Sequence, residues 1–246
     1  MRGLLRNAIV AIVAVSSIAV LAVWGLYRAA RQEPDFYQAA LQVESTVQED
    51  AGDALEREIL DLHNEARAEG RWEAVFTNEQ LNGWLASDLA EKFPNLLPPG
   101  TKDPRVAIRA GQAQIACRHQ SGTLETVISF ALGVHLTEDT NTLAIRISKL
   151  RAGTLPLPLK RFLDGISRAA KNADLRLRWT TMNGDPLALV TVPSQHEDYA
   201  HRAIYLETIE LREGEIYLSG RTEESAAELL AQHAPLKSDK KETDHR

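Results

Sequence analysis

Alternating apolar and polar residues predict two long strands in the middle of the chain. From Thr123 to Glu138 the apolar residues occupy even positions, and from Leu143 to Ser148 they occupy odd positions. A period of two is typical of a strand with one buried face. The length of the first strand predicts strong twisting, with a bend at Gly133. Its even-numbered face consists of Leu124, Thr126, Ile128, Phe130, Leu132, Val134 and Leu136.

An amphipathic helix follows the second strand after a tight corner. The residues that mark this corner are Gly153, Leu155, Pro156 and Pro158. A residue before proline favours an extended backbone, and Pro158 suits the first turn of a helix because it lacks an N–H donor. Spacings of three and four then predict one apolar helix face. That face carries Leu159, Phe162, Leu163, Ile166 and Ala170.

Helical spacing also dominates residues 34–70, with an expected interruption near Gly52. The apolar positions form two stripes, each typical of an amphipathic helix. The first stripe is Phe36, Ala40, Val43 and Val47, and the second is Leu55, Ile59, Leu62 and Ala66. These stripes suit either a helical arm packed on the following domain or a short coiled coil between protomers. The small number of repeats favours packing on the domain.

A second capped helix follows a short strand at Arg71 to Phe76. Thr77 and Gln80 form a capping-box pattern, which predicts a helix that begins at Asn78 and ends near Phe93. Asn82 lies beside the apolar stripe of this helix. A hydrogen bond from Asn82 to nearby backbone explains its position better than a ligand does.

The remaining pattern predicts an α+β fold with a mainly antiparallel curved sheet packed on one or two helices. Further strands are expected at residues 105–109, 113–118, 175–179, 187–192, 201–211 and 216–222, and a short helix at 223–233. Four regions follow from this assignment: residues 1–30 as a transmembrane signal anchor, 33–70 as the helical arm, 71–222 as the α+β domain, and 223–246 as a short helix and polar tail.

The apolar run in the N-terminal region predicts a single membrane span. The run from Ala8 to Leu26 holds no charged residue and is long enough to cross a hydrocarbon core of roughly 30 Å. Ala8, Ile12, Leu21, Trp24 and Leu26 mark this span. Its length favours an uncleaved anchor over a cleaved secretory signal. Flanking arginines are balanced, whereas Glu33 and Asp35 favour an N-terminus inside the cytoplasm.

Composition and motifs argue against several functions. The net charge of −6 offers no concentrated basic face, so we expect no nucleic-acid partner. Neither a nucleophile elbow nor a glycine-rich phosphate loop occurs, so we expect no enzyme and no cofactor. Cys117, His119 and His135 suggest a zinc site only if three positions converge. A buried free cysteine is the commoner arrangement, so we expect no metal.

Three segments occur in a fixed order along the chain, and they are FTNEQLNGWLASDL at 76–89, IRISKLRAGTLPLPLKRFLDGI at 145–166, and AIYLETIELREGEIYLSG at 203–220. Together they resemble the YpmS-like family of uncharacterised membrane-anchored bacterial proteins over residues of about 71–222. The family has an N-terminal anchor, a helix that begins with a Thr-x-x-Gln-Leu-Asn motif, and a Gly-x-Leu-Pro-x-Pro corner. The resemblance implies a single-pass protein of the bacterial cytoplasmic membrane with its C-terminal domain outside the cytoplasm. It implies no catalytic residues.

The predicted shape suggests a groove between sheet and helix that binds lipid or another hydrophobic ligand. Its walls would be Leu124, Ile128, Phe130, Leu132 and Val134 from the strand, and Phe162, Leu163 and Ile166 from the helix. Ordinary core packing would use the same residues. The alternative function is an envelope scaffold that binds a protein partner or a second copy of itself through the helical arm.

Overall fold

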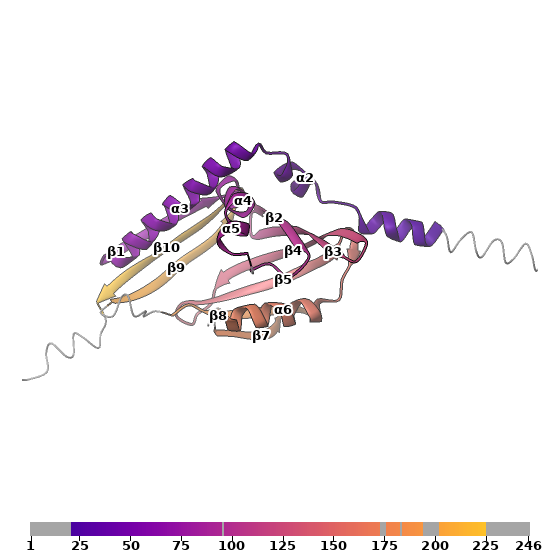
Figure 1. Cartoon of the computed structure of the whole chain (residues 1–246). Coiled ribbons are helices and arrows are strands. Elements are labelled where there is room, and N and C mark those ends of the chain that lie inside the picture. Colours follow the sequence, from indigo (N-terminus) through magenta and orange to yellow (C-terminus); the bar gives the residue numbers. More distant parts are fainter. Residues whose placement is uncertain (1–20, 95, 173–175, 183, 194–201, 225–246) are drawn as a thin grey trace, which may run out of the picture.

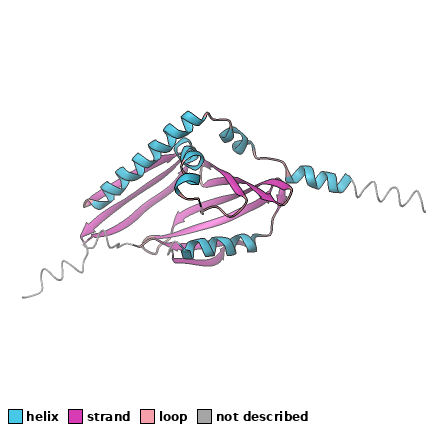
Figure 2. Cartoon of the chain, viewed as in Figure 1, coloured by secondary structure: helices cyan, strands magenta, loops and turns pink. Residues whose placement is uncertain are grey.

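The computed structural model has an α+β fold in which N-terminal helices precede two antiparallel sheets (Figure 1). It describes residues 21–94, 96–172, 176–182, 184–193 and 202–224. Ala8 and Ile12 of the expected span lie outside these residues, as do residues 225–233 of the expected C-terminal helix. Figure 2 shows helices on both sides of the strands.

Three helical segments begin the described chain. Residues 21–30 are helical, followed by α2 (Asp35–Leu41) and α3 (Ser45–Arg67). The expected interruption near Gly52 is wrong, because α3 passes through this residue without a break. Gly52 is buried where α3 crosses α4 (Asn78–Ser87), and a Cβ atom there would lie 2.7 Å from an Asp88 carboxylate oxygen. The glycine allows close helix contact.

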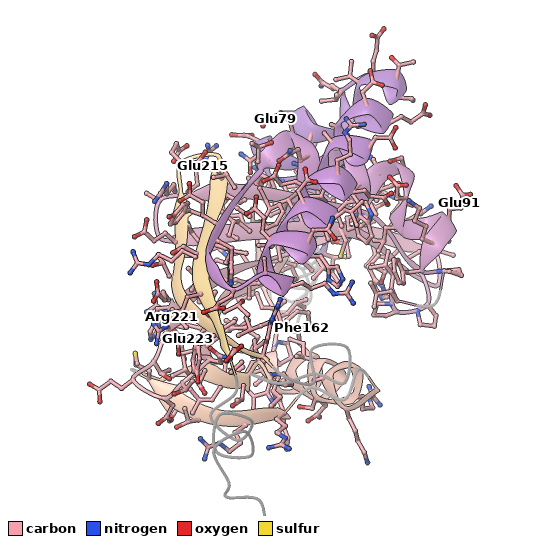
Figure 3. All side chains as sticks on the ribbon, turned by 90° about the vertical axis from the view of Figure 1, so that its left-hand side faces the viewer. Glu79, Glu91, Phe162, Glu215, Arg221 and Glu223 are labelled. Atoms are coloured by element: carbon pink, nitrogen blue, oxygen red, sulfur yellow. The ribbon has the colours of Figure 1, made fainter. Side chains whose placement is uncertain are left out.

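The first sheet has three strands in the order β1 (Gly70–Thr77), β10 (Glu215–Glu224) and β9 (Arg202–Arg212). α3 covers one face of this sheet, where Leu55, Ala74 and Phe76 are buried together. The opposite face is charged, and Figure 3 shows Arg221 and Glu223 on it, joined by an ion pair of 2.7 Å. Because β10 continues to Glu224, the helix expected from Glu223 is wrong at its first two residues.

The second sheet has seven strands, so the expectation of one sheet is also wrong. Alternation identifies a strand but not its partners, and β1, β9 and β10 pair only with one another among the described strands. The order is β2 (Thr101–Arg109), β3 (Gln112–Ser121), β4 (Leu124–Leu136), β5 (Thr142–Ala152), β8 (Asp185–Thr191) and β7 (Arg176–Met182), with β6 (Leu155–Pro156) paired to β5.

The α4 helix joins the two sheets. Its capping box is confirmed: Gln80 donates its backbone N–H to Thr77 Oγ1, and the Thr77 N–H donates to Gln80 Oε1. Asn82 donates to the Val106 carbonyl at 2.7 Å and accepts the Val106 N–H at 2.9 Å. The amide therefore satisfies backbone groups at the edge strand β2 and blocks further strand pairing there.

The chain reverses at the corner after β5 and continues into α6 (Leu159–Asn172). The short helix α5 (Leu89–Lys92) is elsewhere in the chain, directly after α4. Gly153 has a φ of 57°, a left-handed conformation that glycine adopts without strain. β6 then pairs back onto β5, with Ala152 opposite Leu155. This turn places α6 against one face of the seven-stranded sheet (Figure 1).

Candidate functional site

The face of the seven-stranded sheet that packs against α6 is mainly apolar, and we call it the inner face. Strand register places Ile128 opposite Cys117, Phe130 opposite Ile115, and Leu132 opposite both Ala113 and Ile147. Paired residues in a sheet share a face, so the even-numbered residues of β4 all belong to the inner face. The expected groove residues of β4 are therefore neighbours on one surface.

An aromatic pair and a hydrogen bond hold α6 to the inner face. The rings of Phe130 and Phe162 meet with centroids 4.8 Å apart and planes tilted by 59°. The Trp179 indole N–H donates to Ser167 Oγ at 2.7 Å. Figure 3 shows Phe162 on the side of α6 that faces the rest of the molecule. The aromatic pair brings together one expected groove residue from the strand and one from the helix.

The expected groove residues divide into two groups. Leu132 and Val134 pack against a buried cluster of Ile108, Ala113 and Leu211, so they contribute to the core between the sheets. Leu124, Ile128 and Phe130 lie nearer the start of β4, and Leu124 is 36 % exposed. Phe162, Leu163 and Ile166 are half-buried on α6. The surface with the least protein cover thus lies at the Leu124 end of the inner face.

The opposite face of β4, which we call the outer face, is more completely buried. Val127 and Ala131 are only 2 % and 3 % exposed. α2 covers this face, where Tyr37 packs with Ala116 and Val127. The pattern of β4 predicts burial mainly for its even positions, whereas the structure buries small residues at odd positions more fully. Their cover comes from a helix nearly a hundred residues away in sequence.

Cys117 is half-buried on the inner face, opposite Ile128. Burial raises the pKa of its thiol to about 11. His119 shares this face, and its Nδ1 lies 3.2 Å from Thr101 Oγ1. His135 pairs with Ala144 on the outer face, so the three side chains do not converge. Among the described residues, no group of three histidine, cysteine or acidic side chains could hold a metal ion.

The end of helix 21–30 docks on the seven-stranded sheet at a site that sequence reasoning missed. The Ala29 carbonyl accepts the Thr154 N–H at 3.0 Å, and the Ala30 carbonyl accepts the Thr126 hydroxyl. A Cβ atom on Gly153 would lie 2.1 Å from the Ala29 oxygen, so only glycine fits. We call these five residues the anchor junction. No local signal predicts it, because its two sides are about 100 residues or more apart.

The segment after the anchor junction is also fixed to the sheet. Glu33 pairs with Arg118 at 3.7 Å. Tyr37 is fully buried, and its hydroxyl donates to the Asp103 carbonyl at 2.9 Å. Burial is the largest cause that raises the pKa of Tyr37 to about 12, and it lowers the pKa of Arg105 nearby. A cavity of about 310 Å³ lies between this segment, Phe130 and Gly153.

The first part of helix 21–30 leaves apolar side chains in solvent. Leu21, Val23 and Leu26 are 65 %, 67 % and 56 % exposed. The guanidinium of Arg28 lies 5.7 Å from the Trp24 ring centroid, and that of Arg31 lies 4.5 Å from the Tyr27 ring centroid. Within the part of the chain that the structure describes, no helix is both long and apolar enough to span a membrane.

Compared with known proteins, the chain matches no family model, no curated protein and no solved structure.

Proposed function

We propose that this chain is a non-catalytic, membrane-anchored domain that binds lipid or another hydrophobic ligand between the inner face and α6. The observation that carries the proposal is the incomplete cover of apolar residues toward the Leu124 end of the inner face. Leu124, Ile128 and Phe130 remain partly exposed on β4, opposite half-buried apolar residues of α6. Burying such apolar surface under a ligand contributes a favourable binding free energy of roughly 25 cal/mol per Å².

The membrane anchor in this proposal is the apolar run from Ala8 to Leu26. Its described end, residues 21–30, is helical and exposes its apolar side chains. Trp24 lies near the end of the apolar run and Tyr27 directly follows it, and both rings lie beside arginines, an arrangement suited to a membrane interface. Such a helix is stable in lipid because its backbone groups bond within the segment.

The proposed location is the bacterial cytoplasmic membrane, with the folded domain outside the cytoplasm. Glu33 and Asp35 after the anchor favour this orientation. The resemblance of three sequence segments to the YpmS-like family implies the same location. One of them contains the corner before α6, and another contains the capping box of α4.

Photo-crosslinking of the full chain in its membrane tests the lipid site. We expect benzoylphenylalanine at Phe162 to give lipid adducts by mass spectrometry, because the ring lies between α6 and the inner face. The matched control is benzoylphenylalanine at Tyr217, whose ring lies beside Arg212 at 4.0 Å on the charged face of the three-stranded sheet. At least fivefold more adduct at Phe162 supports the proposal. Equal yields, or no adduct at Phe162, contradict it.

A second candidate function, an envelope scaffold, is favoured by exposed apolar residues on α3. Leu55 and Leu62 of the expected stripe pack toward the three-stranded sheet. Ile59 and Leu60 are instead 48 % and 57 % exposed, and they border a shallow cavity with His63. This surface suits a partner helix, such as α3 of a second copy.

Cysteine crosslinking in membranes tests this second function. In a Cys117→Ala background, Leu60→Cys should form a disulfide-linked dimer or a specific heteromeric adduct if α3 is an interface. Glu91→Cys, an exposed position on α5, is the control (Figure 3). Absence of an adduct specific to Leu60→Cys argues against a scaffold role.

A further inference from the structure

We infer that the anchor junction fixes the orientation of the domain on the bilayer, with the Leu124 end of the inner face against the lipid headgroups. The inference rests on the membrane anchor and lipid site proposed above. It concerns a separate property, namely the surface of the domain that contacts the membrane. The occupant of that surface is the headgroup layer of the same bilayer that holds the anchor.

The first step is that the anchor reaches the domain without a free linker. Residues 21–30 are one helix, and its last two carbonyls bond to Thr154 and Thr126. Ala30 is only 8 % exposed. Gly153 donates its backbone N–H to the Val127 carbonyl at 2.8 Å, which fixes the corner to β4 beneath the helix end.

The second step is the short distance from the membrane interface to this junction. Tryptophan prefers the interface, and Trp24 is six residues before Ala30. At 1.5 Å per helical residue this is about 9 Å along the helix. The headgroup region is roughly 5–7 Å thick on each side of the bilayer. The anchor junction therefore lies at the outer boundary of the headgroups.

The third step is that the segment after the helix prevents rotation about the junction. Tyr37 is buried in the outer-face core, and Glu33 pairs with Arg118 of β3. The chain thus contacts β4 and the corner through the anchor junction, and contacts the outer face through α2. Contacts at two separate places define one orientation.

The fourth step identifies the end of the domain that faces the lipid. The β3–β4 turn lies just before Leu124, and Thr126 belongs to the anchor junction. The corner leads within a few residues to Phe162 on α6. Figure 1 shows helix 21–30 at one end of the molecule and the C-terminal end of α3 at the other. The least covered part of the inner face therefore begins beside the bilayer, and a lipid has a short path to it.

Fluorescence quenching in proteoliposomes tests this orientation on the full chain. In a Cys117→Ala background, single cysteines replace Thr123 in the β3–β4 turn or Glu69 between α3 and β1, and each carries the same fluorescent label. Both positions are exposed. Phosphatidylcholine vesicles contain a lipid with a nitroxide on its headgroup. We expect at least threefold stronger quenching at Thr123→Cys than at Glu69→Cys. Equal quenching at the two positions overturns the inference.

A matched pair of glycine variants tests the junction itself. Gly153 and Gly122 have similar φ values of 57° and 63°, but a Cβ atom meets Ala29 only at Gly153 and meets nothing within 4 Å at Gly122. Gly153→Ala should reduce the quenching difference between the two labels by at least half, whereas Gly122→Ala should preserve it. Thr126→Val, which removes one hydrogen bond without adding strain, should act in the same direction as Gly153→Ala. Unchanged quenching in both junction variants overturns the role of the junction.

The crosslinking at Phe162 separates failure of this inference from failure of the lipid site. Lipid adducts at Phe162 without a quenching difference overturn the fixed orientation alone. A quenching difference without adducts overturns the lipid site and leaves the oriented membrane contact supported.

Discussion

At the scale of single residues, burial determines the chemistry of the one cysteine. Cys117 lies on β3 opposite Ile128 of the inner face, and burial raises the pKa of its thiol to about 11. The thiolate is the reactive form, and an unperturbed thiol has a pKa of about 8.5. The sequence predicts a buried, unreactive thiol better than a metal ligand, because alternation along a strand already indicates which side chains face inward.

Alkylation kinetics check the state of Cys117. At pH 8 we expect iodoacetamide to react roughly 200-fold more slowly with the folded chain than with the chain in urea, because the raised pKa reduces the thiolate fraction. The folded rate should increase about tenfold per pH unit up to the pKa, because the thiolate fraction grows by that factor. Equal folded and unfolded rates would show that the thiol is not protected.

Other single residues show where local patterns are sufficient. The Thr77 and Gln80 capping box involves residues three apart, so the sequence alone predicts it. Asn82 is predicted to bond to nearby backbone, and it does donate to the Asn78 carbonyl. Its bonds to Val106 depend on how α4 meets β2, which no local pattern contains.

At the scale of elements, the crossing of α3 and α4 depends on two glycines. A Cβ atom on Gly83 would lie 2.5 Å from the Gln48 carbonyl oxygen and 2.6 Å from the Gly52 nitrogen. Glycine has low helix propensity, which is why the sequence suggests an interruption at Gly52. The tertiary contact outweighs that propensity, since close packing of the two helices needs small residues at the crossing.

Alanine substitutions distinguish the crossing from ordinary helix propensity. Gly83→Ala should lower the free energy of unfolding by about 1–3 kcal/mol, because the methyl group forces the helices apart. Gly165→Ala on α6 is the control, since nothing lies within 4 Å of its Cβ position. We expect that variant to gain up to about 1 kcal/mol.

Urea unfolding of the full chain in detergent, followed by circular dichroism, measures both variants. Equal changes in the two unfolding midpoints would contradict a role for Gly83 at the helix crossing.

The strands show a similar division between local and distant information. Their positions and alternation are largely readable from the sequence, but their partners are not. A bulge near Lys149, which has a φ of 55°, lets both Ile147 and Leu150 be buried although they are three residues apart. A strict period of two would place residues 147 and 150 on opposite faces, so it predicts neither this bulge nor the division into two sheets.

At the scale of the whole molecule, Asn141 links the two sheets. It lies in the β4–β5 turn with a φ of 51° and is only 4 % exposed. Its amide donates to the Ile204 carbonyl at 2.7 Å and accepts the Leu206 N–H at 2.8 Å, and both partners belong to β9. The turn of one sheet therefore satisfies backbone groups of the other.

Replacement of Asn141 tests this link. Asn141→Gly retains the left-handed turn but leaves two backbone groups of β9 without their partner, so we expect a loss of about 1–3 kcal/mol in the free energy of unfolding. Asn141→Ala should lose about 1 kcal/mol more, because alanine is strained at positive φ. Thermal and urea unfolding measure these losses. An unchanged midpoint for Asn141→Gly would mean that the two sheets do not depend on this side chain.

The anchor junction has a consequence for how this protein can be divided and recombined. A membrane helix joined by a flexible tether is an interchangeable part, but here residues 29 and 30 complete the surface of a domain whose corner is more than 120 residues later in the chain. A truncated protein that begins at residue 33 loses the partners of Thr126 and Thr154. A chimera with a different N-terminal helix needs a small side chain at position 30, because Ala30 is only 8 % exposed. Residues 29 and 30 therefore belong to the folded domain as well as to the helix that they end.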